Sequence, residues 1–553
     1  MPKLIIDGKE IEFENGQTII EVAKKDGLEI PHFCWHPSLS ISGNCRVCLV
    51  EVEKMPKLVI ACSTIAADGM VVNTQSEKTL NARNAVMEFL LINHPLDCPI
   101  CDEAGECKLQ DYAYKHSAGE SRFVETKNHK DKRIQLGPRI MFDQERCISC
   151  SRCIRFSDEI AKENQLTFVQ RGDHVTIRTF PGEEFDNPYT LNTVDICPVG
   201  ALTSNDFRFQ TRVWELSSTE SICVGCSRGC NTEVWVRDNE IKRLTPRENF
   251  DVNSYWMCDH GRVNTWKNVN ADTRIDGCLK DGEKISWEDA IKSVSDGLTQ
   301  YQPEEILFIG SAFASNEDNF LFKKLAEKKG VHEVYFASAI KPGDADDILI
   351  QEDKTPNSLG ASKIGLTGSN DNKSLSKKIS DGKYKAAFIL EDDLTRLEED
   401  VIKSLQNIEF LIVQATNENQ LTKEANLVLA ASTFAEKHAT YTNFLGMVQR
   451  VKPAVTSANM DRALDSMSKS RWDKFATTFD RWGRGKKYDS KPGWSILSGI
   501  LNEMGEEKNY QMAEDVFDEL AKEISDFNGM NYDTIGSGGA LLKSFTKQEA
   551  ETV

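Results

Sequence analysis

Cysteine is distributed unevenly along this chain of 553 residues, and that distribution limits what the chain can fold into. All 16 cysteines lie at or before Cys278, so nearly half of the sequence contains none. A chain of this length has room for about three to four domains with apolar cores, so disulfides are not needed to explain its stability. Closely spaced cysteines in a reducing compartment are better explained as metal ligands or redox groups. The first half therefore carries metal or redox chemistry.

Charge and hydropathy exclude several partners. The formal net charge is -19 at pH 7, whereas nucleic-acid binding requires concentrated Lys and Arg. The same charge disfavours direct attachment to anionic lipid. No apolar run approaches the ~20 residues of a membrane helix, and the N-terminus begins with a strand pattern instead of a signal peptide. We expect a cytosolic protein without a direct membrane span, associated with any membrane only through other subunits.

A short strand and helix pattern precedes the first cysteines. Asp7-Gly8 interrupts the apolar runs of residues 4–13, and glycine accepts the positive φ that a two-residue hairpin turn requires. Residues 18–27 have the apolar spacing and the end signals of a helix. Two strands and a helix before a cysteine-rich loop predict a small ferredoxin-like (β-grasp) domain over residues 1–78.

The first cysteine group lies in that domain. Its gaps are ten, two and thirteen residues, and plant-type ferredoxins have a similar close pair within a set of four. Gly43 beside the pair would let the backbone approach a cluster closely. We interpret the group as a [2Fe-2S] site, and a zinc site of four thiolates is the alternative that the close pair alone fits equally well. The first group consists of Cys34, Cys45, Cys48 and Cys62.

The second cysteine group begins where a helix, expected over residues 80–92, ends at His94-Pro95, because proline cannot continue the helical hydrogen bonds. The group supplies only three thiols, so a fourth ligand must come from elsewhere. Spacing alone leaves open whether His94 is that ligand or only ends the helix. This segment covers residues 79–120, and the second group consists of His94, Cys98, Cys101 and Cys107.

The third cysteine group has the spacing of bacterial [4Fe-4S] ferredoxins and a distant Cys-Pro as its fourth member. A two-cluster ferredoxin would carry four more cysteines, and those positions are held here by Ser157, Asn187, Thr190 and Thr193. We therefore predict a ferredoxin-like domain over residues 138–210 with one cluster and one lost site. The third group consists of Cys147, Cys150, Cys153 and Cys197.

The fourth cysteine group, in a domain expected over residues 216–272, has three close cysteines and a fourth after 27 residues. Its spacing fits a [4Fe-4S] cluster, but it is also the group that spacing separates least well from zinc. Cys278 has no cysteine neighbours and is expected to be a small buried apolar residue. The fourth group consists of Cys223, Cys226, Cys230 and Cys258.

The four groups together use every cysteine except Cys278. Iron-sulfur clusters require soft, anionic ligands, which thiolates provide and ordinary hydrogen-bonding side chains do not. A cluster exchanges one electron with little change of geometry. Several clusters in one chain therefore indicate electron conduction, and a catalytic pocket is not needed to explain them.

The cysteine-free half, residues 273–553, alternates helical and apolar strand patterns. Strands are expected over residues 306–309, 386–390 and 410–413, with helices from about residues 287 and 316. This alternation predicts a layered α/β domain with a mainly parallel sheet. No glycine fingerprint, phosphate loop or nucleophile elbow follows these strands. NADH and flavin are therefore expected to bind to other subunits.

The segment from His94 to Cys107 is very similar to the motif of one histidine and three cysteines in the G subunit of respiratory complex I and in related hydrogenase subunits. That resemblance implies that His94 is a cluster ligand. The first group resembles the [2Fe-2S] domain of that family, and the third group resembles its next [4Fe-4S] site. The fourth group resembles the cluster domain of molybdopterin oxidoreductases, which some bacterial complex I enzymes keep off the main electron path.

The resemblance implies one [2Fe-2S] and three [4Fe-4S] clusters in a subunit without an active site of its own. Electrons would leave flavin on an NADH-binding partner and pass through the first three groups toward quinone. The other implied partners are the ferredoxin-like and quinone-proximal subunits of the peripheral arm. The chain would lie on the cytoplasmic side of the inner membrane, held there by these subunits.

The cysteine-free half resembles a reduced molybdopterin oxidoreductase domain, most clearly around Glu436 and residues 440–443. Leu445 and Met447 stand where molybdoenzymes usually have Glu and Arg, and no later cysteine could hold molybdenum. We expect a scaffold without that cofactor, and a serine-ligated molybdenum is the alternative. The alternatives are the large subunit of an NAD-linked formate dehydrogenase or a hydrogenase, and a zinc-stabilised interaction protein. Further cysteines needed by an iron-only hydrogenase are absent from the sequence.

Overall fold

The computed structural model describes residues 1–117, 119–369, 372–382, 384–460 and 485–546. The chain divides into two compact units, Met1–Trp214 and Glu215–Val553. The first three cysteine groups lie in the N-terminal unit and the fourth lies in the C-terminal unit.

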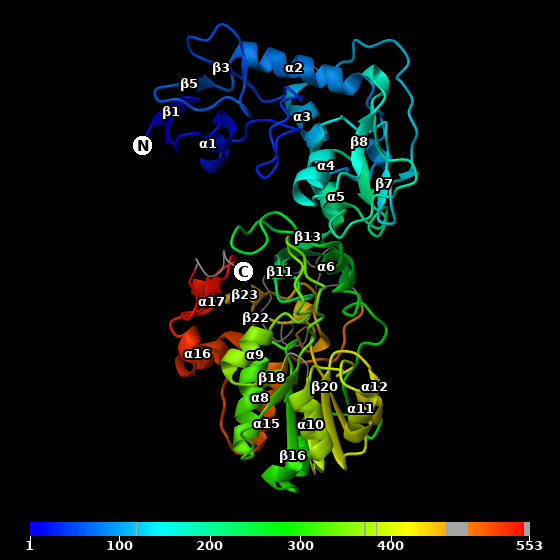
Figure 1. Ribbon diagram of the computed structural model, residues 1–553, viewed down its shortest axis with the longest axis vertical. Helices are drawn as coiled ribbons and strands as arrows, with labels where there is room; N and C mark the ends of the chain where they lie inside the picture. The colour runs from blue at the N-terminus through cyan, green and yellow to red at the C-terminus, as the bar shows by residue number, and fades with distance from the viewer. Residues whose placement is uncertain (118, 370–371, 383, 461–484, 547–553) are drawn as a thin grey trace, which may run out of the picture. The chain divides into compact units, whose positions relative to one another are not determined.

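The N-terminal unit begins with a mixed sheet of five strands in the order β2-β1-β5-β3-β4 (Figure 1). The β1–β2 turn has positive φ at Asp7 (46°) and Gly8 (84°), as the hairpin prediction requires. Helix α1 packs its apolar face on this sheet, which confirms the ferredoxin-like (β-grasp) fold. The elements are β1 (Lys3–Ile6), β2 (Lys9–Glu12), α1 (Ile19–Lys25), β3 (Leu49–Val52), β4 (Val59–Ile60) and β5 (Val71–Asn73).

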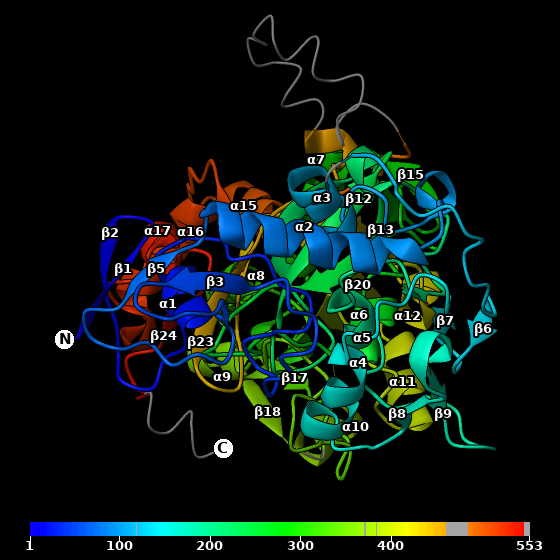
Figure 2. The same ribbon diagram turned by 90° about the horizontal axis from the view of Figure 1, so that it is seen from above.

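Helix α2 (Glu77–Ile92) leads from this sheet to the second cysteine group. It begins three residues before the expected start because Ser76 accepts a hydrogen bond from the Thr79 amide. Figure 2 shows α2 along its length, with α3 beside it. The remaining elements of the unit are α3 (Lys108–His116), β6 (Ile134–Gln135), β7 (Ile140–Phe142), α4 (Arg152–Arg155), β8 (Leu166–Val169), β9 (Thr176–Thr179), α5 (Asn192–Asp195) and β10 (Leu202–Ser204).

The C-terminal unit opens with an antiparallel sheet of three strands that carries the fourth cysteine group. Helix α6 follows this sheet, and a second three-stranded sheet, β22-β23-β24, lies in the same unit. The elements are β11 (Ser217–Ile222), β12 (Asn231–Arg237), β13 (Glu240–Pro246), α6 (Asp259–Asn264), β22 (Ala439–Thr442), β23 (Met447–Val451) and β24 (Ala540–Leu541).

The main sheet of this unit has eight strands in the order β15-β14-β21-β20-β19-β16-β17-β18. Strands from β21 to β18 are parallel, and β14 runs antiparallel to β21. The chain order of the parallel strands reverses between β16 and β19, which is the arrangement of a doubly wound fold. The strands are β14 (Cys278–Lys280), β15 (Glu283–Ile285), β16 (Ile306–Gly310), β17 (Tyr335–Ala337), β18 (Thr367–Ser369), β19 (Ala386–Leu390), β20 (Phe410–Ala415) and β21 (Leu427–Ala430).

Helices cover both faces of this sheet, so successive strand residues belong to different cores (Figure 1). Phe308 and Phe388 lie in one core, whereas Ile309 and Ile389 lie in the other. Burial on both faces explains why these strands are continuous apolar runs. One face is covered by α7 (Trp287–Thr299), α8 (Asn316–Lys328), α9 (Ser358–Ile364), α15 (Gly493–Glu503) and α16 (Ala513–Glu523), and the other by α10 (Lys373–Asp381), α11 (Glu399–Gln406) and α12 (Gln420–Glu424); α17 (Tyr532–Ile535) precedes β24.

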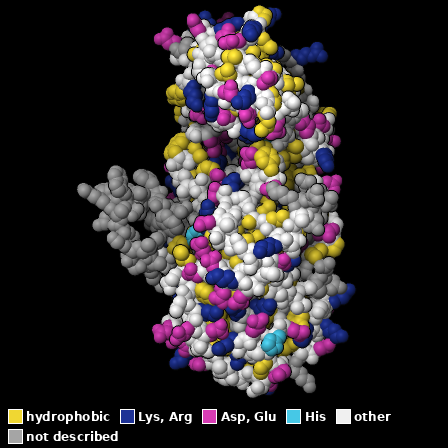
Figure 3. Space-filling model, turned by 90° about the vertical axis from the view of Figure 1, so that its left-hand side faces the viewer, with side chains coloured by type: hydrophobic (Ala, Val, Ile, Leu, Met, Phe, Trp, Pro, Cys, Tyr) yellow, Lys and Arg dark blue, Asp and Glu magenta, His cyan; other side chains and the backbone are white. Residues whose placement is uncertain are grey.

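Charged side chains of both signs are interspersed over the face shown in Figure 3. Among the described residues, every helix is too short or too polar to span a bilayer. Cys278 is buried in the apolar core beneath the main sheet, which agrees with its predicted packing role.

Candidate iron-sulfur sites

The thiols of the first cysteine group meet in two pairs. Cys45 hydrogen-bonds to Cys34, and this bond lowers the pKa of the Cys34 thiol to about 5. Cys48 likewise hydrogen-bonds to Cys62 and lowers the pKa of that thiol. Thiolate is the form that binds iron, so this packing favours the ligand form in one thiol of each pair. Gly43 has a φ of 62°, and a Cβ there would lie 3.2 Å from the Ile60 side chain.

The residues of the second cysteine group lie between the end of α2 and the start of α3. Cys98 opens a short 3-10 turn that ends at Cys101, and Cys107 is the N-cap residue of α3. Burial raises the pKa of Cys107 to about 12. Burial lowers the pKa of His94 to about 4, so at pH 7 its imidazole is neutral, which is the form that ligates metals.

Arg146 is a charged neighbour of the second group. Its positive charge acts on both His94 and Cys101. The guanidinium is held by Asp97, which accepts a hydrogen bond from Nη2 at 2.9 Å, and by Asp143. Arg146 is therefore a buried positive charge next to this site. The spacing of the candidate ligands in the sequence does not predict its position.

The third cysteine group has two buried members, Cys150 and Cys153, and two of intermediate exposure, Cys147 and Cys197. Ser149 and Ser151 have φ values of 53° and 64°, and these left-handed residues turn the chain so that the close thiols lie together. The Ser149 amide donates to Cys147 Sγ at 3.4 Å. Burial, followed by the charges of the other three thiols, raises the pKa of Cys153 well above its usual value.

The four positions predicted to be a lost second site belong to a buried polar network. Ser157, Asn187, Thr190 and Thr193 are all buried. Asn187 Nδ2 donates to Gln165 Oε1 at 2.9 Å, and Thr193 Oγ1 donates to the Thr190 carbonyl at 2.6 Å. Their side chains therefore hydrogen-bond within the protein in place of ligating a cluster.

The fourth cysteine group lies between β11, β12 and α6. The Cys223 amide donates to the Cys230 carbonyl at 2.8 Å, and Cys258 Sγ accepts from the Gly261 amide at 3.3 Å. A Cβ at Gly261 would lie 2.8 Å from Cys223 Sγ and 3.3 Å from Cys258 Sγ. Glycine thus leaves space beside two sulfurs. Burial and the charges of its three partners raise the pKa of Cys230.

The first three groups are joined by short protein contacts. Asn44, next to Cys45, donates to the Ser149 carbonyl at 3.1 Å, so the loops of the first and third groups touch. Between the third and second groups, Cys107 Sγ lies 3.9 Å from the Pro198 carbonyl oxygen. A Cβ at Gly200 would lie 2.3 Å from Cys101 Sγ, so residues just after Cys197 pack against the second group.

The donor chemistry of the four groups fits iron-sulfur clusters better than hard cations, because soft thiolates and imidazole select such clusters and zinc. The absence of a Cβ at Gly200 and at Gly261 leaves space beside sulfurs of the second and fourth groups. Across the described ranges, no three His, Cys, Asp or Glu side chains are placed to hold one metal ion.

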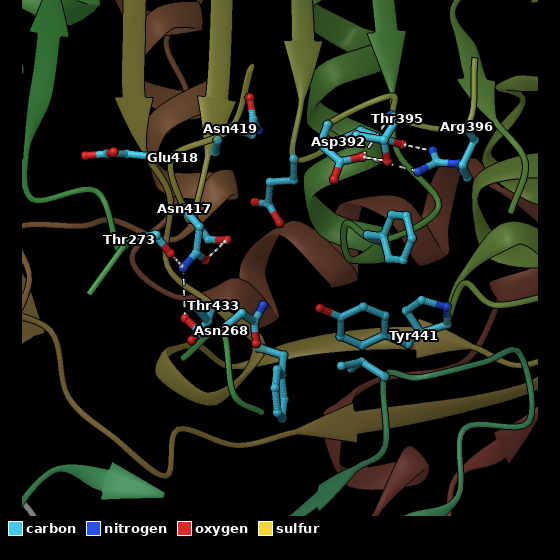
Figure 4. A pocket seen from close by; sticks show the side chains of 18 residues that line it. Asn268, Thr273, Asp392, Thr395, Arg396, Asn417, Glu418, Asn419, Thr433 and Tyr441 are labelled. Atoms are coloured by element: carbon cyan, nitrogen blue, oxygen red, sulfur yellow. Dashed lines mark hydrogen bonds and ion pairs between the residues drawn. The ribbon is translucent and has the colours of Figure 1, made fainter. Parts of the chain in front are cut away.

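A cavity of about 530 Å³ lies at the carboxyl edge of the main sheet in the C-terminal unit (Figure 4). It adjoins the ends of β16, β19, β20 and β21, where doubly wound folds bind ligands. Four acidic residues line it, and its arginine, Arg396, pairs with two of them. The acids are Glu391, Asp392, Asp393 and Glu418.

This lining does not fit a molybdopterin cofactor, which is anionic and carries phosphate. Carboxylates repel phosphate, and Arg396 is already neutralised by Asp392 at 2.5 Å. The cavity also has no cysteine among its lining residues. The cavity is therefore assigned no part in electron transfer.

Five family models match parts of the chain. They are the 2Fe-2S iron-sulfur cluster binding domain (residues 3–77), the NADH-ubiquinone oxidoreductase-G iron-sulfur binding region (83–122), the ferredoxin-like domain of NADH-quinone oxidoreductase subunit 3 (137–203), the molybdopterin oxidoreductase Fe4S4 domain (216–270) and molybdopterin oxidoreductase (352–464). Part of the last match lies outside the described residues.

Curated relatives are 40% to 42% identical to this chain over the matched residues. The G subunit of NADH-quinone oxidoreductase from Rickettsia conorii is 42% identical over 335 residues, which cover 60% of this chain and 49% of the relative. The NADH-ubiquinone oxidoreductase 75 kDa subunit of Reclinomonas americana is 40% identical over 344 residues, covering 61% and 49%. The chain therefore spans about half the length of these relatives. A solved chain of an NAD⁺-reducing [NiFe]-hydrogenase is 31% identical, with a TM-score of 0.35, over 38% of this chain and 91% of that chain.

The β-grasp sheet, the cysteine-rich domains and the doubly wound sheet define a multidomain protein with 2Fe-2S and 4Fe-4S binding domains. Over the matched 335 to 344 residues, the chain is homologous to the G subunit of NADH-quinone oxidoreductase and to the 75 kDa subunit of NADH-ubiquinone oxidoreductase.

Proposed function

We propose that this chain is the electron-transfer subunit of an NADH:quinone oxidoreductase, passing electrons from flavin on a partner subunit toward quinone. The observation that supports this most directly is the continuity of the first three groups, whose loops touch through Asn44 and through residues 198–200. Electrons tunnel efficiently only between centres that lie close together. The chain itself would bind neither NADH nor quinone.

Each group has a separate role in the proposal. When bound, an iron-sulfur cluster takes up and returns one electron at a time. The first group would hold a [2Fe-2S] cluster, and the other three would hold [4Fe-4S] clusters. His94 would replace one thiolate in the second group, and its neutral imidazole makes that ligand set less negative. The fourth group would hold its cluster in the C-terminal unit, off the main path.

The partners in this proposal are the peripheral-arm subunits of complex I that carry flavin, the ferredoxin-like clusters and the quinone-proximal cluster. They would hold the chain on the cytoplasmic side of the inner membrane. The support is the homology of this chain to the G subunit and the 75 kDa subunit.

Metal analysis tests this proposal against its alternatives. Protein purified without oxygen should contain about 14 iron atoms per chain and neither molybdenum nor zinc. Reduction should give EPR signals of one [2Fe-2S] and of [4Fe-4S] centres. Colourless protein with stoichiometric zinc would replace the proposal with a structural zinc protein, and stoichiometric molybdenum would replace it with a catalytic subunit.

Gly200→Ala should remove the cluster of the second group. The added Cβ would lie 2.3 Å from Cys101 Sγ and 2.9 Å from the Glu103 Cβ, closer than atoms pack. Iron should fall from about 14 to about 10 atoms per chain, measured after anaerobic purification. Gly538→Ala is the control, since nothing lies within 4 Å of its Cβ position. A full iron content in the Gly200 variant would show that this space does not matter.

A further inference from the structure

Arg152, the first residue of α4, connects the loops of the first and third cysteine groups. Its Nη2 donates to the carbonyl of Trp35 at 2.5 Å, and its Nη1 donates to the carbonyl of Ile196 at 2.9 Å. Trp35 follows Cys34 directly, and Ile196 directly precedes Cys197. One guanidinium therefore spans the backbone beside a candidate ligand of each group.

The Arg152 side chain is buried, with a residue exposure of 5%. Throughout the described chain, it has no carboxylate partner, and its two hydrogen-bond acceptors are neutral carbonyl oxygens. A buried charge without a counter-charge is unfavourable. After burial, the largest electrostatic influences on its charge are four thiols, two of the first group and two of the third: Cys34, Cys45, Cys150 and Cys197.

A second arginine on the same helix makes a useful contrast. Arg155 is only half-buried and donates to the carbonyls of Cys34 and Ser40, both in the loop of the first group. Its described hydrogen bonds do not reach the segment of Cys197. Arg155 therefore also holds the loop of the first group against α4. Docking of that loop does not explain why Arg152 is buried.

We propose that Arg152 is a positioning residue that serves both the first and the third cluster as their shared counter-charge, and so raises both reduction potentials together. This inference rests on the proposed function. A positive charge stabilises the reduced, more negative state of a nearby anionic centre. Because one charge acts on both centres, it shifts both potentials in the same direction and leaves the difference between them little changed.

Arg152 undergoes no chemical change during the electron transfer that it assists. One electron arrives at the first site and one leaves for the third, or the reverse. No bond forms or breaks, and the guanidinium keeps its proton because arginine is not deprotonated in proteins. Its hydrogen bonds to Trp35 and Ile196 also give a continuous bonded route between the two ligand loops.

Potentiometric EPR on the full chain tests this inference. Arg152→Gln and Arg152→Met remove the charge. Each should lower the equilibrium constant for reduction of both the first and the third cluster about tenfold, which is a fall in midpoint potential of roughly 59 mV for one electron. Arg152→Lys keeps the charge and should restore most of both potentials. Arg83→Gln is the matched control, because Arg83 is also buried and bonded to two carbonyls but is close to Cys48 of the first group only.

The outcomes separate the alternatives. The proposal of a shared counter-charge would be wrong if the potentials of the Lys variant shifted as far as those of the Gln variant. It would also be wrong if the potential of only one cluster shifted. Loss of both clusters from the neutral variants but not from the Lys variant would support it, and loss from all three would contradict it. Wild-type protein lacking two distinct cluster signals would instead refute the proposed function itself.

Discussion

Cys153→Ala should remove one [4Fe-4S] cluster and stop electron flow from NADH to quinone in membranes that contain the variant. Cys153 is buried, the charges of the other three thiols of its group act on it, and alanine offers no ligand in its place. Iron should fall by about four atoms per chain. The third group touches both other groups of the N-terminal unit, so electrons would have no second route. We expect at least about a hundredfold loss of NADH:quinone activity, roughly 2.7 kcal/mol in the rate barrier.

Two variants give this experiment its controls. Cys278→Ala removes a buried cysteine that packs in an apolar core, and it should leave both iron and electron flow unchanged. Cys226→Ala should also remove about four iron atoms but leave electron flow largely intact, because the fourth group is proposed to lie off the path. If Cys153→Ala lost its iron and kept wild-type activity, the third group could not be on the path.

The 2Fe-2S and 4Fe-4S binding domains could be predicted from the sequence because cysteine spacing is a local property, and the individual ligands stay predictions. The turn at Asp7-Gly8 and the strands around Phe308 and Phe388 could be predicted for the same reason: their signals are a positive φ and a short apolar run. The spacing also predicts a lost cluster site that includes Asn187, but it does not predict the hydrogen bonds that this residue makes.

Long-range features could not be predicted in this way. Gly200 packs against Cys101, about a hundred positions earlier in the sequence, and Arg152 reaches back to Trp35. Each looks ordinary in the sequence, since glycine and arginine are common beside turns. Their roles come from the folded loops, and local sequence patterns carry no signal for them. The same holds for Arg146, whose charge reaches both His94 and Cys101.

A buried ion cluster in the C-terminal unit is the other feature that only the fold exposes. Lys437 Nζ donates to Asp318 Oδ2 at 2.6 Å and to Glu391 Oε2 at 3.3 Å, and the Lys437 and Asp318 side chains are 1% and 0% exposed. Burial raises the pKa of Glu391 to about 7, although the charge of Lys437 acts in the opposite direction. Helix α8 and the end of β19 are held together by this lysine.

Lys437→Met should lower the free energy of unfolding by about 3–5 kcal/mol at pH 8, since it leaves two buried carboxylates without a cation. The folded pKa of Glu391, about 7, lies above its ordinary value of 4.5, so the folded state binds that proton more tightly. Stability from this group is therefore present below about pH 4.5 and is lost as pH rises through about 7. Removing Lys437 raises this pKa further, so the variant should be destabilised less at pH 5 than at pH 8, as measured by urea unfolding of the full chain. Lys385→Met breaks an exposed pair with Glu305 and should change the free energy of unfolding little at either pH. Equal losses for the two variants at pH 8 would mean that the buried cluster contributes no more than a surface ion pair.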